Sequence, residues 1–162
     1  MILIALGSNL PSRAGGPRET LQAALDALAE HGIAVSAVSP FYETPAWPDP
    51  NDPRYVNAVA LVKSDLAPQT LMESLQRIET SLGRQRSARN APRTLDLDVI
   101  DYDGRVEEGP PVLPHPRMQS RAFVLLPLFD IIPNWCHPVS GESVATLIAN
   151  LPGGAEGVVR LG

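Results

Sequence analysis

The sequence contains very little cysteine: Cys136 is the only one among 162 residues, so a disulfide within the chain is excluded. A single thiol fits a reducing compartment. The sequence also has no apolar run of membrane-spanning length. Its apolar start, MILIALGSNL, lacks the positively charged n-region of a signal peptide and is too short to cross a bilayer. We therefore expect a cytoplasmic protein without a membrane partner.

Lysine is almost absent as well: of the 13 lysines and arginines, only Lys63 is a lysine. The net charge is −5 and the pI about 5.1, which disfavours electrostatic binding of nucleic acid by the whole surface. Arginine suits bidentate recognition of phosphate or carboxylate, although GC-rich coding produces the same usage. The apolar content of 44% and the length predict one domain, residues 1–162, around a single core. We also expect the protein to be a monomer.

The apolar periodicity predicts a definite order of elements. They are a strand at 2–6, a helix from Pro17 to Gly32, one or two strands within 33–44, a strand at 55–63, a helix between Asp65 and Gly83, a strand at 95–101, helices near 120–130 and 142–150, and a short strand at 158–161. Asp103-Gly104 predicts a hairpin turn. This order predicts an α+β fold with a ferredoxin-like β-α-β-β-α-β core, extra C-terminal helices, and a mostly antiparallel sheet with helices packed on it.

Two carboxylates stand out in the sequence LDLDV. Asp96 and Asp98 alternate with apolar residues, so on a strand they share one face and lie about 7 Å apart. Charged groups are rarely buried unless they are paired or hold a metal. Hard oxygen ligands suit Mg²⁺, which usually takes one or two protein carboxylates together with water and substrate phosphates. The alternative is a pair of solvent-facing aspartates on a half-exposed strand.

Four arginines crowd the segment just before this strand: Arg84, Arg86, Arg89 and Arg93. Like charges in a short loop repel one another unless an anion joins them. A polyphosphate held between the arginines and carboxylate-bound Mg²⁺ satisfies both sets of charges. The alternative is a solvated basic loop that is ion-paired to Asp96 and Asp98. The sequence has no G-x-x-x-x-G-K-[ST] motif, so this is not a P-loop protein.

Glu79 lies in the last turns of the predicted second helix, where a carboxylate opposes the helix macrodipole. It is therefore either exposed or held for an arginine, a metal or a ligand. Its position alone favours exposure.

Six segments occur together in a fixed order: GSN after the first strand, FYETPA, YVNAV, QRIETSLGR, RTLDLDVI and LPHPRMQSRAF. Together they resemble the 6-hydroxymethyl-7,8-dihydropterin pyrophosphokinases of the folate pathway. The resemblance runs from residue 2 to about residue 135, and residues 136–162 carry no predicted role. It implies transfer of the β,γ-pyrophosphoryl group of ATP to the hydroxymethyl group of a reduced pterin, with release of AMP.

The resemblance also implies roles for individual residues. Asp96 and Asp98 would hold two Mg²⁺ ions that bridge ATP, and Arg84 and Arg93 would be catalytic arginines on the triphosphate. The nucleotide site would be lined by Gln76, Glu79, Arg86, Arg89, His115 and Arg121. The pterin pocket would be lined by Thr44, Pro45, Trp47, Tyr55, Asn57 and Phe123, with Tyr55 and Phe123 on the two faces of the ring.

Two other functions remain open at the level of sequence. A Mg²⁺-dependent phosphohydrolase would use the same aspartate pair but transfer the group to water. A ferredoxin-like RNA-binding or regulatory module would use the arginine loop to grip a nucleic-acid backbone. The second alternative does not need two aspartates beside its arginines, and the net charge of −5 counts against it.

Overall fold

A computed structural model describes residues 1–45, 51, 53–83 and 94–161 of the protein. Within this described part, one sheet of six strands forms the middle of the molecule, and every pairing in it is antiparallel. The strands are β1 (Ile2–Ser8), β2 (Ala34–Val38), β3 (Tyr42–Thr44), β4 (Tyr55–Lys63), β5 (Asp96–Tyr102) and β6 (Val159–Arg160). Their order across the sheet is β5-β1-β4-β3-β6, and β2 also pairs with β4.

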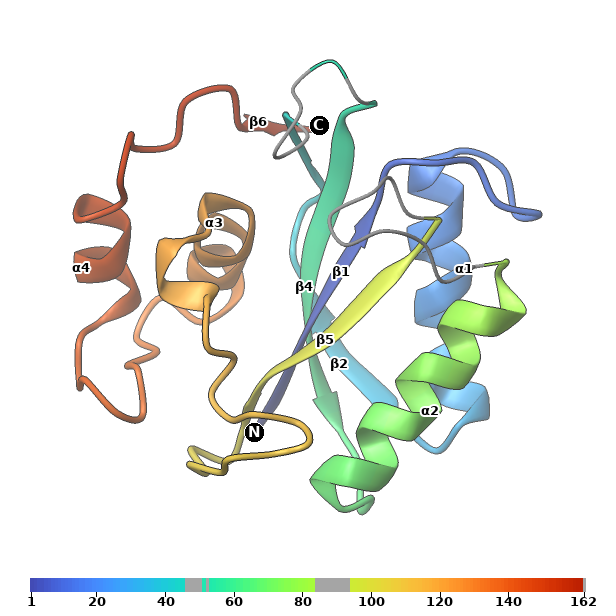
Figure 1. Ribbon diagram of the computed structural model, residues 1–162, viewed down its shortest axis with the longest axis horizontal. Coiled ribbons are helices and arrows are strands. Elements are labelled where there is room, and N and C mark those ends of the chain that lie inside the picture. The colour runs from blue at the N-terminus through green and yellow to red at the C-terminus, as the bar shows by residue number, and fades with distance from the viewer. Residues whose placement is uncertain (46–50, 52, 84–93, 162) are drawn as a thin grey trace.

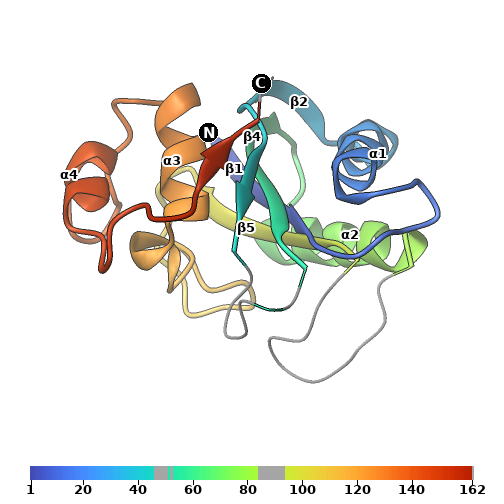
Figure 2. The same cartoon turned by 90° about the horizontal axis from the view of Figure 1, so that it is seen from above.

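Helices cover both faces of the sheet (Figures 1 and 2). On one face lie α1 (Pro17–Glu30) and α2 (Pro68–Ser81), and on the other lie α3 (Ala122–Ile131) and α4 (Val144–Ala149). Both α1 and α2 begin with proline, whose fixed φ suits the first turn and whose missing N–H is not needed there. The predicted α+β fold, with its ferredoxin-like core and extra C-terminal helices, is confirmed. None of the described helices is both long and apolar enough to cross a membrane.

Two clusters of buried apolar residues hold these layers together, one on each face of the sheet. The first lies under α1 and α2, where the apolar faces of the two helices, with Leu21 on α1 and Leu75 on α2, pack in one cluster with Ile4 and Leu6 of β1. The second lies under α3 and α4 and includes Trp135. Burying such side chains stabilises each layer by roughly 1.5–3 kcal/mol per large residue. The space near the start of β5 on the second face is not filled by either cluster.

A β-bulge divides β5 into two parts. Val99 pairs with Ile4 and Asp101 pairs with Leu3, so Ile100 is the extra residue. The bulge shifts the alternation of side chains, because it adds one residue without a partner. Ile100 packs in the second cluster, and the next residue, Asp101, faces the same side, where it contacts Trp135. Tyr102, which simple alternation from Asp96 would also place on this side, packs in the first cluster instead.

The hairpin predicted at Asp103-Gly104 is wrong in part. The tight turn is present, because both residues have positive φ (52° and 71°) and the N–H of Arg105 donates to the carbonyl of Tyr102 at 2.9 Å. No described strand returns along β5, however, and the chain instead makes an isolated bridge between Glu107 and Leu113. From this bridge the chain runs on to α3, on the second face of the sheet.

Candidate functional site

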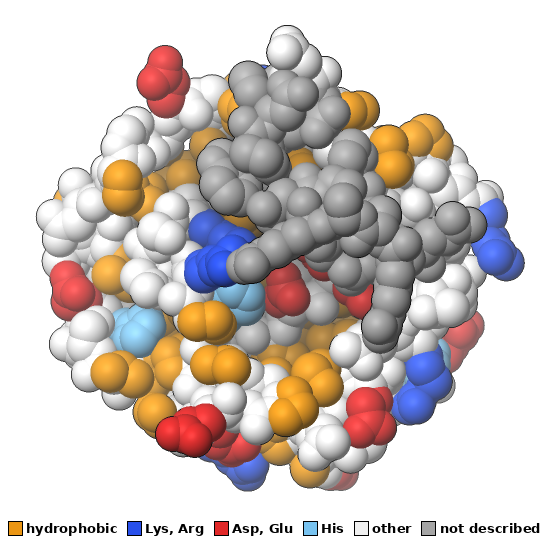
Figure 3. All heavy atoms as spheres, in the orientation of Figure 1, with side chains coloured by type: hydrophobic (Ala, Val, Ile, Leu, Met, Phe, Trp, Pro, Cys, Tyr) orange, Lys and Arg blue, Asp and Glu red, His pale blue; other side chains and the backbone are white. Residues whose placement is uncertain are grey.

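A pocket of about 710 Å³ opens on the α3 face of the sheet, beside the first half of β5. It brings together most of the described residues that the sequence predicts for the site. They are Thr44, Pro45, Tyr55, Asn57, Asp96, Asp98, His115, Arg121 and Phe123. On the face of the molecule shown in Figure 3, basic, histidine and acidic side chains gather next to one another near the centre.

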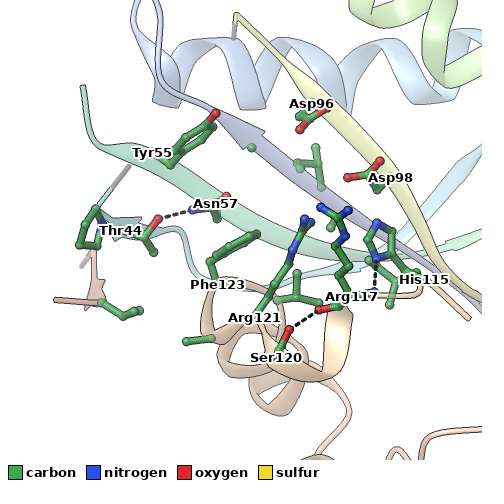
Figure 4. A pocket seen from close by; sticks show the side chains of 18 of the residues that line it. Thr44, Tyr55, Asn57, Asp96, Asp98, His115, Arg117, Ser120, Arg121 and Phe123 are labelled. Atoms are coloured by element: carbon green, nitrogen blue, oxygen red, sulfur yellow. Dashed lines mark hydrogen bonds between the residues drawn. The ribbon is translucent and has the colours of Figure 1, made fainter. Parts of the chain in front are cut away.

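The acidic end of the pocket is formed by Asp96 and Asp98, which are half-buried and point into it from β5 (Figure 4). Directly across on β1, Asp96 faces Gly7 and Asp98 faces Ala5. Side chains opposite each other on neighbouring strands share a face. Because glycine and alanine are the smallest residues, the space above β1 stays open in front of both carboxylates.

The opposite end of the pocket is a slot of amide, hydroxyl and aromatic groups. Asn57 is 4% exposed, and its Nδ2 donates to the hydroxyl of Thr44 at 2.8 Å. This bond fixes the side-chain amide and leaves its second N–H and its carbonyl oxygen to face other partners. Tyr55 and Phe123 lie on different sides of Asn57 in Figure 4. A Cβ added to Gly7 would lie 2.8 Å from Asn57 Oδ1, so the GSN motif supplies a glycine where no side chain fits.

Cationic and histidine side chains reach the pocket from the segment before α3. Arg117 and Arg121 extend toward the same space in front of Asp98 (Figure 4). The guanidinium carbon of Arg121 also lies 5.4 Å from the ring centre of Phe123, within range of a cation–π contact. The two arginines thus lie between the acidic end and the slot.

His115 is uncharged at neutral pH. Its pKa is lowered to about 4, mainly by burial and then by the charges of Arg121 and Arg117, whereas Asp96 acts in the opposite direction. The backbone N–H of Arg117 donates to His115 Nδ1 at 3.2 Å. The proton of the neutral ring is therefore on Nε2, which makes His115 a hydrogen-bond donor that adds no charge.

Two predicted residues on α2 lie away from the described lining of the pocket. Gln76 is exposed, and Glu79 is only 5% exposed, so the expectation of an exposed Glu79 is wrong. Glu79 Oε2 accepts a hydrogen bond from the backbone N–H of Leu97 at 2.8 Å. Since β5 is at the end of the sheet that the described residues form, this carboxylate accepts a hydrogen bond that a further strand would otherwise take, beside the two aspartates. The nucleotide-binding role of Gln76 and Glu79 stays a prediction.

The remaining predicted residues lie outside the described part of the chain: Trp47, Arg84, Arg86, Arg89 and Arg93. Conversely, the pocket contains residues that the sequence did not indicate. Among them are Gly7, Arg117, Gly154 and Val158. Gly7 could have been found from its motif directly after a buried strand. No periodicity or spacing pointed to Gly154 and Val158, which lie about 50 residues beyond β5 and reach the pocket only through the fold.

The domain is an antiparallel α+β fold with one pocket that has two different ends. One end carries an acidic pair, arginines and a neutral histidine, and the other is an amide-aromatic slot. These are the features of a group-transfer enzyme. Such a site binds a phosphorylated donor beside a flat acceptor. The family described as 7,8-dihydro-6-hydroxymethylpterin-pyrophosphokinase (HPPK) matches residues 3–133 of the chain. The chain belongs to this family.

Individual relatives agree with this assignment. The chain is 42% identical to a 2-amino-4-hydroxy-6-hydroxymethyldihydropteridine pyrophosphokinase of Pseudomonas aeruginosa over 99% of this chain and 96% of the relative. It is 39% identical to the protein of the same name from Synechocystis, over 90% of this chain and 73% of the relative. The resemblance carried by the six sequence segments is thereby confirmed.

Solved structures support the fold. The chain aligns with a Plasmodium falciparum HPPK-DHPS structure at a TM-score of 0.73 and 12% identity, over 98% of this chain and 46% of that one. A second, of wild-type HPPK-DHPS, aligns at a TM-score of 0.67 and 15% identity, over 90% of this chain and 40% of that one. The chain thus spans less than half of each of these two longer proteins, and the likeness concerns the architecture alone.

Proposed function

We propose that the protein transfers pyrophosphate from ATP to 6-hydroxymethyl-7,8-dihydropterin, giving the pterin diphosphate and AMP, in folate biosynthesis. The observation that carries this proposal is a single pocket with a carboxylate pair at one end and an amide-aromatic slot at the other, in a member of this family. We further propose that residues 1–162 act as one pyrophosphokinase domain. Neither the phosphohydrolase nor the RNA-binding module accounts for the slot.

The slot suits a flat heterocycle. Asn57 offers an amide to a ring edge that carries both donors and acceptors, and its bond to Thr44 holds that amide in one orientation. Tyr55 and Phe123 offer aromatic faces, which favour offset stacking with a planar ring. The hydroxymethyl group of the pterin would then point along the pocket toward the aspartates.

The acidic end suits Mg²⁺ with a nucleotide. Among the described residues, no group of three or more His, Cys, Asp or Glu could hold a metal ion by itself. Asp96 and Asp98 offer two carboxylates, which fits an ion that takes its other ligands from water and substrate phosphates. When bound, two such ions would neutralise phosphate charge and orient the triphosphate.

The side chains of this chain would mainly position reactants and stabilise charge. The pterin hydroxyl oxygen would form a bond to the β-phosphorus of ATP, the bond from that phosphorus to the α,β-bridging oxygen would break, and AMP would leave with that oxygen. The hydroxyl proton would pass to solvent. Arg121 and Arg117 would stabilise phosphate charge, and neutral His115 would donate from Nε2. Arg84 and Arg93 remain predicted catalytic arginines.

Incubation of the protein with ATP, Mg²⁺ and the pterin tests the reaction. AMP formed only when the pterin is present supports the proposal. Orthophosphate formed without pterin would instead indicate a hydrolase, and neither product would indicate a binding module. The Phe123→Ala variant should bind the pterin more weakly by roughly 1–3 kcal/mol through lost stacking and burial, with a much smaller change for ATP. An equal loss for both ligands in calorimetry would make Phe123 a core residue.

We also propose that the enzyme is a monomer of the cytoplasm that binds no nucleic acid. The support is that one chain supplies both ends of the pocket and that the net charge is −5. Light scattering of the purified protein with and without ATP measures the assembly state directly.

A further inference from the structure

The C-terminal segment, residues 152–161, returns from α4 to the sheet and reaches the pterin end of the pocket. Its strand β6 lies at one end of the described sheet (Figures 1 and 2). It pairs with β3, with Arg160 opposite Tyr42 and Val159 opposite Glu43. Just beyond β6, the N–H of Leu161 donates to the carbonyl of Phe41 at 2.8 Å. The segment is therefore docked on the strand that ends in Thr44, the hydroxyl partner of Asn57.

Two residues of this segment line the pocket itself. Gly154 and Val158 face the same cavity as Thr44, Asn57 and Phe123. Most of the segment is exposed, and its side chains contribute little to either apolar cluster. Its placement thus rests on polar contacts and backbone pairing more than on buried apolar surface.

Arg54 also holds the C-terminal segment. Its Nη2 donates to the carbonyl of Gly157 at 2.7 Å, and its Nε donates to Glu43 Oε1 at 2.6 Å. Arg54 lies directly before Tyr55 of β4, and its one planar guanidinium joins this end of β4 to β3 and to the C-terminal segment. The exposed ion pair to Glu43 contributes little by itself, so the important contact for the segment is the one to Gly157.

Gly157 fits closely against the pocket. Its φ is +76°, and a Cβ at this position would lie 2.8 Å from Pro45 Cγ, inside any normal contact distance. Pro45 lines the pocket next to Thr44. Gly153 provides a natural comparison, because its φ is +73° but a Cβ there would meet nothing within 4 Å. The two glycines share the same backbone requirement and differ in contact with the pocket.

We propose that residues 152–161 form a wall of the acceptor slot that sets the affinity for the pterin, and that Arg54 is the positioning residue that holds this wall. The proposal rests on the pyrophosphokinase function proposed above. The wall ends in β6, at the end of the described sheet opposite β5 and its aspartates, so the wall would contact the ring of the acceptor and not the triphosphate. A change where the wall contacts the pocket, as at Gly157, should therefore affect pterin binding and leave ATP binding unchanged, whereas a change at Gly153, where a Cβ would meet nothing within 4 Å, should affect neither.

The experiment is steady-state kinetics with each substrate varied in turn, together with thermal unfolding of each variant. Gly157→Ala and Gly153→Ala should both lose thermal stability, because both place alanine at positive φ, and Gly157→Ala should lose more, because its Cβ also meets Pro45. Only Gly157→Ala should also raise the KM for the pterin, by roughly tenfold, with the KM for ATP within about twofold. Equal pterin KM values for the two variants would overturn the proposal.

Arg54 is tested in the same way. Arg54→Ala should raise the pterin KM by roughly tenfold, whereas Glu43→Gln, which leaves the contact to Gly157 in place, should change it less than about twofold. A rise of both KM values by the same factor in Arg54→Ala, or an equal effect of Glu43→Gln, would show a general structural role and overturn the proposal. If the unaltered protein forms no AMP, the proposed function fails instead, so the two failures are distinguishable.

Discussion

Strand β5 carries aspartates in two different settings. Asp96 and Asp98 precede the bulge at Ile100 and are half-buried in the pocket. Asp101 follows the bulge and is 1% exposed, with its Oδ2 accepting from the indole N–H of Trp135 at 2.9 Å and its Oδ1 accepting from the N–H of Gly104 at 3.0 Å. The same residue type therefore faces the proposed ligand site in one half of the strand and supports the tertiary structure in the other.

The difference lies in what surrounds each carboxylate. Asp101 is buried next to donors that the fold itself supplies, which offsets the cost of removing its charge from water. It thereby joins β5 to Trp135, the buried residue between α3 and α4. Asp96 and Asp98 instead face small residues of β1 and the open pocket. A substitution in the first half of β5 should thus change activity, and one in the second half should change stability.

The largest expected effect is that of Asp96→Ala or Asp98→Ala on turnover. Each should reduce AMP formation by more than about 10³-fold, because the proposed metal site loses several kcal/mol of charge stabilisation. Without metal, the free energy of unfolding should be unchanged or slightly higher, because two neighbouring carboxylates repel each other. The measurements are AMP release and urea unfolding. Near-normal turnover in either variant would refute the metal assignment.

Asp101→Ala should show the opposite pattern. Removing its carboxylate leaves the buried indole N–H of Trp135 and the N–H of Gly104 without this acceptor, which should lower the free energy of unfolding by roughly 2–4 kcal/mol. Turnover per folded molecule should stay within a few-fold of normal. The control is Asp101→Asn, whose amide oxygen still accepts from Trp135 and should restore part of the stability. A large loss of turnover at unchanged stability would break the comparison between the two halves of β5.

The effects of replacing Glu79 should be intermediate between those of the Asp96 and Asp98 variants, which lose turnover, and those of the Asp101 variant, which loses stability. Glu79→Ala removes the acceptor of the Leu97 N–H, which lies between the two aspartates, and should lower the free energy of unfolding by roughly 1–3 kcal/mol with some loss of turnover. Glu79→Gln keeps an acceptor oxygen and separates two roles. If Glu79 only supports the edge of β5, the glutamine variant should recover a normal KM for ATP. A raised KM for ATP in that variant would favour the predicted role in nucleotide binding.

The smallest effect concerns the protonation of His115. Its folded pKa is about 4, below the unfolded value of about 6.5, so the unfolded state takes up a proton first as the pH falls. Stability is therefore lost between about pH 6.5 and pH 4, and His115→Gln should make that loss shallower while leaving stability at pH 7 nearly unchanged. Urea unfolding across this range measures the slope. An unchanged slope would mean that His115 titrates alike in both states.

The pKa of His115 also distinguishes the two settings of the aspartates on β5. Asp96 raises the pKa of His115, whereas Asp101 is not among the groups that shift it. Asp96→Asn should lower that pKa further, and Asp101→Asn should leave it unchanged. NMR titration of the His115 ring measures its pKa in each variant. Equal pKa shifts in the two variants would show that the aspartates of both halves of β5 act on His115 alike.

The sequence was sufficient wherever a local pattern decides the outcome. Period-two alternation placed Asp96 and Asp98 on one face of a strand, and apolar stripes after Pro17 and Pro68 predicted both helices of the first face. Four of the six sequence segments contain the predicted residues that line the pocket, from Thr44 in FYETPA to Phe123 in LPHPRMQSRAF. These features depend on backbone periodicity or on motifs of adjacent residues, which the sequence displays directly.

The tertiary structure decided the features that depend on residues far apart in the chain. Simple alternation does not reveal the bulge at Ile100, which brings Asp101 to Trp135, and the position of Glu79 on a helix does not reveal its bond to Leu97. The C-terminal segment has no motif, yet Arg54 contacts Gly157 across 103 positions of sequence. The physical reason is that burial and hydrogen-bond partners are set by the packing of separate elements, whereas a short stretch of sequence determines only which way each side chain faces along its own element.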